Sequence, residues 1–86
     1  MPQNITKGIK ALLAEANAMV DTMSVEDAKE KAQDESYVFV DLRDIRELQR
    51  SGMIPGAFSC PRGMLEFWID PDSPYQKPIF NQDKTY

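Results

Sequence analysis

Near the N-terminus, apolar residues recur at steps of three and four, the pattern of one face of an amphipathic helix. Asn4 precedes them and is a residue type that caps helix N-termini. The polar face carries both signs of charge and no basic cluster, which disfavours a helix lying on a membrane surface. The pattern predicts a helix over residues 5–23 that docks onto its own domain or onto a sister subunit. Its apolar positions are Ile5, Ile9, Leu12, Leu13, Ala16, Met19, Val20 and Met23.

The next apolar stretches predict a short helix and a strand. Ser24 followed by Asp27 resembles a capping box in which Asp replaces the usual Glu, so a helix is expected over residues 25–33. Residues 37–42 read Tyr-Val-Phe-Val-Asp-Leu, an almost continuous run of β-branched and aromatic side chains. Such runs are typical of a strand that is covered on both faces in a parallel sheet.

A second helix-and-strand pair follows at once. Asp44 begins a helix over residues 45–51, and Gly52 stands where a left-handed cap would end it. Residues 54–56, Ile-Pro-Gly, predict a turn, and residues 57–60 predict a second strand that Pro61 ends by lacking an amide hydrogen. The order helix, helix, strand, helix, strand favours an open α/β fold.

The C-terminal third is less regular. Residues 63–69 predict one or two helical turns that expose Glu66 and bury Leu65, Phe67 and Trp68. The proline-rich residues 70–78 predict a loop. Residues 85–86, Thr-Tyr, are similar to the opening of a further strand. We therefore expect a parallel sheet that is incomplete within this chain, with open faces and edges that another polypeptide covers.

Composition and charge narrow the function classes. The chain has 86 residues, 42% of them hydrophobic and 28% charged, with a net charge of −4. These values indicate a globular chain, and the missing basic stripe disfavours nucleic acid as a partner. We expect neither a signal peptide nor membrane association, because the apolar run at residues 11–14 is too short for either, and we expect a cytoplasmic location.

Candidate chemistry is limited by the absence of histidine and the presence of a single cysteine, Cys60. A disulfide within the chain, a Cys/His zinc site and serine–histidine catalysis are therefore excluded. Asp70 and Asp72 lack the spacing of a calcium loop, so no metal site is expected. Cys60 comes directly before Pro61 with no glycine-rich loop around it, which favours a buried structural thiol.

One segment carries a recognisable motif. A hydrophobic strand ends in Asp41-x-Arg43, Glu47 follows on a short helix, and Gly-Met-Ile-Pro-Gly-Ala leads into the next strand. This segment closely resembles the first signature of rhodanese-like domains, although Met53 stands where the family usually has histidine. The structural residues of the motif are Glu47, Gly52, Pro55, Gly56 and Ala57. The resemblance covers residues 24–86 and leaves residues 1–23 as an N-terminal helical extension; residues 62–67 further resemble small single-domain bacterial members.

The resemblance implies a rhodanese-like open parallel sheet flanked by helices, of which this chain holds the N-terminal part. It also implies a sulfurtransferase that carries sulfane sulfur as a cysteine persulfide, without a cofactor. In the family the catalytic cysteine lies in a Cys-x-x-Gly-x-Arg loop, which has no counterpart in this sequence and is expected after Tyr86. No catalytic residue is therefore assigned, and the chain alone should be inactive. The alternatives are a non-catalytic binding or regulatory module, and a relative of the phosphatases that share this fold.

Four charged residues are candidates for the substrate pocket. Asp41 and Arg43 should lie at the carboxyl end of the first strand, where ligands of open α/β sheets gather, although an internal ion-pair network with Glu47 is the favoured reading. Arg62 and Glu66 follow the second strand. Arg62 could attract an anionic sulfur donor such as thiosulfate, or form a solvated salt bridge at the rim. The expected polypeptide partner is a complementary C-terminal segment, present as a separate chain, or a homodimer or swapped partner.

Overall fold

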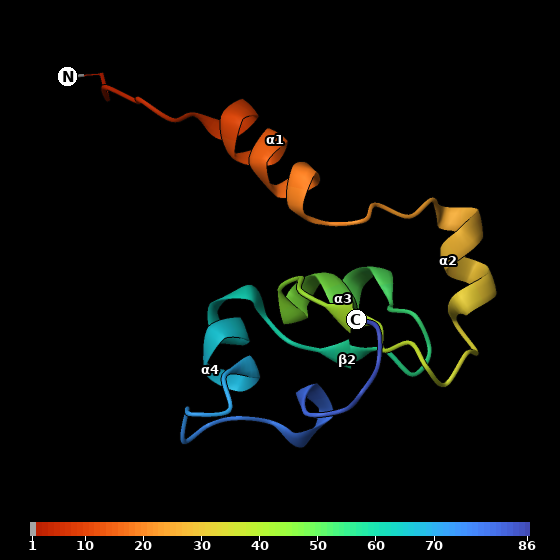
Figure 1. Ribbon diagram of the computed structural model, residues 1–86. Coiled ribbons are helices and arrows are strands. Elements are labelled where there is room, and N and C mark those ends of the chain that lie inside the picture. Colours follow the sequence, from red (N-terminus) through yellow and green to blue (C-terminus); the bar gives the residue numbers. More distant parts are fainter. Residues whose placement is uncertain (1) are drawn as a thin grey trace.

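The computed structural model of the protein describes residues 2–86 and contains six short helices and a small parallel sheet (Figure 1). In chain order the elements are α1 (Ile9–Met19), α2 (Val25–Lys31), β1 (Val40–Asp41), α3 (Ile45–Ser51), β2 (Phe58–Ser59), the 3₁₀ helix η1 (Arg62–Met64), α4 (Leu65–Ile69) and the 3₁₀ helix η2 (Pro78–Phe80). Among residues 2–86, no helix combines the length and the apolar character needed to cross a membrane.

β1 and β2 pair in parallel, with Val40 opposite Phe58 and Asp41 opposite Ser59. The N–H group of Phe58 donates to the carbonyl oxygen of Phe39 over 2.8 Å, which extends the pairing toward the start of the strand. This pairing confirms the predicted parallel α/β arrangement. The regular part of the first strand is shorter than the predicted residues 37–42, because β2 offers only two residues to pair with.

A third strand segment lies on the other side of β1. Thr85 forms a parallel bridge with Tyr37, and the N–H group of Val38 donates to the carbonyl oxygen of Thr85 over 2.8 Å. Successive residues of a strand point their backbone groups to alternate sides, so Val38 faces Thr85 while Phe39 and Asp41 face β2. The order across the sheet is Thr85, β1, β2, which agrees with the prediction that residues 85–86 open another strand.

The two connections between these strands cover opposite faces of the sheet. α3 links β1 to β2, and the segment from η1 to η2 links β2 back past β1 to Thr85. Because these crossovers run in opposite directions across the sheet, right-handed connections place them on opposite faces. In Figure 1, α3 lies on one side of β2 and η2 on the other.

The N-terminal helix is shorter than predicted. α1 covers Ile9–Met19 in place of residues 5–23, and its N-cap is Gly8 with no side-chain hydrogen bond, so Asn4 is not the cap. Glycine is a poor helix former, and within the described chain no residue of α1 is buried, so neither end of the helix is held by packing. The apolar periodicity therefore continues beyond the helix that forms.

α2 and α3 begin where the sequence predicts. The Ser24 hydroxyl accepts a 3.2 Å hydrogen bond from the N–H group of Asp27, so the capping-box prediction for α2 is confirmed, although α2 ends at Lys31 and not at residue 33. Asp44 caps α3 by accepting a 2.8 Å bond from the N–H group of Arg46.

The predicted burial of Phe67 is wrong, because Phe67 is 52% exposed and its ring packs edge-on against Tyr75 in the loop.

The core is small. Within residues 2–86, the buried apolar residues are Leu48 on α3 and Cys60 directly after β2. Around them the ring of Phe58 makes edge-on contacts with Trp68 at 5.8 Å and with Phe80 at 5.7 Å between ring centroids. Trp68 is half-buried, as its predicted core position requires.

Candidate functional site

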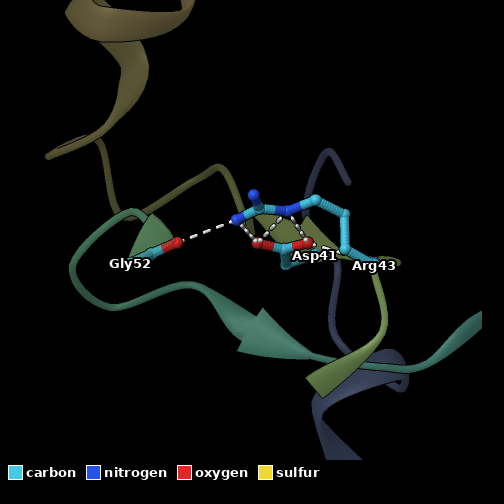
Figure 2. Close-up of polar contacts among 3 residues, drawn as sticks. All are labelled: Asp41, Arg43 and Gly52. Atoms are coloured by element: carbon cyan, nitrogen blue, oxygen red, sulfur yellow. Dashed lines mark hydrogen bonds and ion pairs between the residues drawn. The ribbon is translucent and has the colours of Figure 1, made fainter. Parts of the chain in front are cut away.

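Asp41 and Arg43 form a closely bonded pair at the carboxyl end of β1 (Figure 2). The backbone N–H group of Arg43 donates to Oδ1 of Asp41 over 3.1 Å, its Nε donates to the same oxygen over 3.0 Å, and Nη2 donates to Oδ2 over 2.8 Å. Nη2 also donates to the carbonyl oxygen of Gly52 over 3.0 Å. One guanidinium therefore ties the end of β1 to the end of α3, nine residues along the chain.

The electrostatics of this pair favour full ionisation. Hydrogen bonds from Arg43 lower the pKa of the Asp41 carboxyl below its usual value, and the bond to Asp41 raises the pKa of Arg43. The Asp41 side chain is 13% exposed and the Arg43 side chain 41% exposed. A bidentate fork is the strong geometry for an Arg–carboxylate pair. Because these donors of Arg43 bond to groups of its own chain, the main effect of the pair is to stabilise the connection between β1 and α3.

Glu47 and the glycines of the motif shape the surroundings of this pair. Glu47 lies in the first turn of α3, and its negative charge contributes to the raised pKa of Arg43. Gly52 has φ +77°, as the predicted cap requires, but its ψ of 179° is extended and not left-handed helical. This backbone is nearly restricted to glycine, and it lets the Gly52 carbonyl turn toward Arg43.

The turn into β2 forms as predicted. The N–H group of Ala57 donates to the carbonyl oxygen of Ile54 over 3.0 Å, which closes a turn around Pro55 and Gly56. Gly56 also has a positive φ, +81°. Met53 does not alter this geometry, because the turn depends on Pro55 and on the two glycines.

Arg62 and Glu66 lie beyond the carboxyl end of β2. Nη1 of Arg62 is 2.7 Å from Oε1 of Glu66, and the two side chains are 63% and 66% exposed. The pKa of Glu66 is lowered, first by its own backbone N–H group and then by the hydrogen bond from Arg62. The N–H group of Arg62 donates to the carbonyl oxygen of Leu42 over 3.2 Å, so this pair and the Asp41–Arg43 pair lie on the same edge of the sheet.

Cys60 is buried beneath this edge of the sheet and is not exposed on it. Its relative exposure is 0%, and its N–H group donates to the carbonyl oxygen of Asp41 over 2.9 Å. Burial raises the pKa of the Cys60 thiol, and Arg62 offsets this only in part. A reactive thiolate needs an exposed sulfur with several amide donors aimed at it, which is the opposite of this environment.

An apolar groove on the sheet was not anticipated from the sequence. It has a volume of about 340 Å³ and lies over the face of β1 that carries Val40 and Leu42. The period-two alternation of valine and leucine in the strand was the available signal, since residues two apart share a face. Its lining residues are Val40, Leu42, Leu65, Ile69, Phe80 and Tyr86. Among residues 2–86, no three His, Cys, Asp or Glu side chains converge as metal ligands would.

The parallel strands, the helices on both faces and the charged pairs at the carboxyl edge define an open α/β domain. The model of the rhodanese-like domain matches residues 24–86. The chain belongs to the rhodanese-like domain family. α1 lies outside the matched residues.

A solved structure supports the same fold. It is that of a protein of unknown function from Rhodopseudomonas palustris, described as a possible tyrosine phosphatase, and it is 59% identical to this chain with a TM-score of 0.90. The similarity covers 98% of this chain and 65% of that chain, so this chain spans about 65% of the relative's length. Among curated proteins, none matches this chain.

Proposed function

We propose that this chain is the N-terminal part of a rhodanese-like sulfurtransferase and that the catalytic cysteine lies in a segment following Tyr86. Membership of the family supports this assignment. The observation that carries it is the complete burial of Cys60, the single thiol of the chain. A persulfide carrier must expose its sulfur to a donor and an acceptor in turn, so Cys60 is not the carrier.

In this proposal the chain supplies the frame around the cysteine loop. The Asp41–Arg43 pair fixes the end of β1 against Gly52, and β1 lies between its two neighbours in the sheet. Arg62 stands at the same carboxyl edge, where its charge favours the approach of a small anion such as thiosulfate. Glu66 balances that charge in the absence of substrate.

The reaction that the family implies proceeds through two successive transfers of one sulfur atom. A cysteine thiolate attacks the outer sulfur of thiosulfate, a new S–S bond forms, and sulfite leaves with the electrons of the broken S–S bond. Cyanide or an acceptor thiolate then attacks the outer sulfur of the persulfide, and the cysteine leaves as thiolate. Backbone amides of a tight loop would stabilise the thiolate and the persulfide. This chain contributes none of the atoms that change bonds.

The open apolar surface supports the proposal of a polypeptide partner. Leu42, Ile69 and Tyr86 line the groove and are 43%, 44% and 50% exposed. The proposed occupant of the groove is the C-terminal segment that completes the domain, contributed by the same polypeptide or by a separate one. A homodimer or a swapped partner is the alternative, and the oligomeric state in solution distinguishes the two.

The test is reconstitution. The part of the R. palustris protein that this chain does not match is expressed separately, mixed with this chain, and assayed for thiocyanate formed from thiosulfate and cyanide. We expect turnover in the mixture and none with either part alone. A mixture that forms a stable complex but transfers no sulfur would contradict the enzyme assignment and favour a non-catalytic module.

Phosphate-ester hydrolysis is the second candidate, favoured by the description of the R. palustris relative as a possible tyrosine phosphatase. The same mixture is assayed with p-nitrophenyl phosphate. Release of p-nitrophenol without thiocyanate formation would replace the sulfurtransferase assignment with this one.

A further inference from the structure

α1 presents an apolar stripe that its own chain does not cover. The stripe runs along one side of the helix and includes Ile9, Leu12, Leu13 and Met19, which are 67%, 48%, 55% and 87% exposed. Figure 1 shows α1 standing clear of the sheet and of the other helices. An 11-residue helix is marginal in water by itself, so its stability must come from packing of this stripe.

The position of α1 recurs in a solved structure. The R. palustris relative matches 98% of this chain at a TM-score of 0.90, and this match includes α1 as well as the domain. The described part of this chain buries no residue of α1, so packing within residues 2–86 does not hold the helix in place. The relative has residues beyond the match that are available for such a contact, since the match covers only 65% of its chain.

A hollow in the surface connects the base of α1 with the open sheet. It has a volume of about 390 Å³, and its lining includes Asp21 and Met23, which follow α1, together with Val38, Val40 and Tyr86 of the sheet region. Val40 and Tyr86 also line the apolar groove on the sheet. A polypeptide lying on this face of the sheet therefore reaches the segment from which α1 projects.

We propose that α1 binds the C-terminal part of the rhodanese-like domain, and that its apolar stripe packs against the polypeptide that completes the sheet. The proposal rests on the proposed function, because it takes that segment to belong to the same domain. It goes further by giving a role to a helix that lies outside the residues matched by the family model. A second copy of this chain is the competing occupant of the stripe.

The test measures the affinity between this full chain and the unmatched part of the R. palustris protein, by isothermal titration calorimetry. Leu12→Glu places a charge on the stripe. Ala18→Glu is the matched control, because residue 18 lies on the opposite side of the helix and receives the same charge. We expect Leu12→Glu to weaken binding at least tenfold and Ala18→Glu to change it less than twofold. Hydrogen–deuterium exchange of the α1 amides should slow when the segment binds.

Three results would contradict this role of α1. If Leu12→Glu binds within twofold of the unmodified chain, the stripe is not the contact, while the proposed function stands. If the segment does not bind even the unmodified chain, the proposed role of α1 and the proposed function are both wrong. If light scattering shows that this chain alone is a dimer and that Leu12→Glu makes it a monomer, the stripe belongs to a second copy.

Discussion

The backbone N–H group of Cys60 donates to the carbonyl oxygen of Asp41 over 2.9 Å, which continues the parallel ladder one residue past β2. This bond anchors the single thiol of the chain inside the sheet, directly beneath the edge where Asp41 and Arg43 meet. The residue with the most reactive side chain therefore has a structural position, and the edge above it carries two ion pairs.

Alkylation of Cys60 should be slow. Burial raises the pKa of its thiol, so less of it is reactive thiolate at a given pH than in an ordinary cysteine, and no surface of the residue is exposed to reagent. We expect iodoacetamide at pH 8 to modify the folded chain at least tenfold more slowly than the chain in urea, as measured by mass spectrometry. Equal rates in the two states would contradict the buried position.

The Asp41–Arg43 pair should make stability depend on acid pH. Because the pKa of Asp41 is lowered in the fold, its contribution is complete above the unfolded value of about 4 and is lost as the pH falls through the lowered folded value. Asp41→Asn should therefore lower the urea midpoint at pH 7, and its difference from the unmodified chain should shrink as the pH falls below about 4. Fluorescence of Trp68, the single tryptophan, follows the unfolding.

The matched control for this prediction is Asp83→Asn, which changes an exposed aspartate near the C-terminus. It should leave the urea midpoint at pH 7 close to that of the unmodified chain. A loss as large as that of Asp41→Asn would mean that the effect reflects overall charge and not the fork.

Gly52 should be intolerant of a side chain. Its φ of +77° with an extended ψ strains any residue that has a Cβ, although no heavy atom lies within 4 Å of the position such a Cβ would take. Gly52→Ala should cost about 1–3 kcal/mol of unfolding free energy, through backbone strain alone. Gly63→Ala is the control, since Gly63 is equally open but has no positive φ, and it should change stability by less than about 1 kcal/mol. Equal losses in urea denaturation would refute the strain argument.

Leu48 is the main anchor of α3. It is 7% exposed and is the buried residue of that helix. Leu48→Ala should cost about 2–5 kcal/mol, because it removes buried methyl groups and leaves a cavity. Leu42→Ala, at a position 43% exposed, should cost clearly less in the same urea titration. If both substitutions cost the same, α3 does not rest on Leu48.

Local signals in the sequence predicted the local structure well. The caps at Ser24 and Asp44 and the positive φ of Gly52 depend on contacts within a few residues, so they could be read directly. Element lengths could not be predicted in this way, because the extent of a helix or strand depends on what packs beside it. α1 is shorter than its apolar pattern, and β1 is limited by the length of β2.

The position of the four charged residues and their ion pairs could be predicted from the sequence, but the further anchoring of Arg43 could not. Spacing placed Asp41, Arg43, Arg62 and Glu66 at one edge of the sheet, where the structure has them. The bond from Arg43 to the Gly52 carbonyl depends on the path of the α3–β2 connection, which residue spacing does not specify. The burial of Cys60 depends likewise on the register of β1 against β2.

The most direct test of the central claim is the rate of sulfur transfer by the reconstituted domain when Cys60 is replaced. We predict that a mixture of the Cys60→Ala chain with the C-terminal segment forms thiocyanate from thiosulfate and cyanide at the rate of the unmodified mixture, and that this chain alone forms none. Turnover by this chain alone that disappears in Cys60→Ala would contradict the account, because it would place the persulfide on the buried thiol.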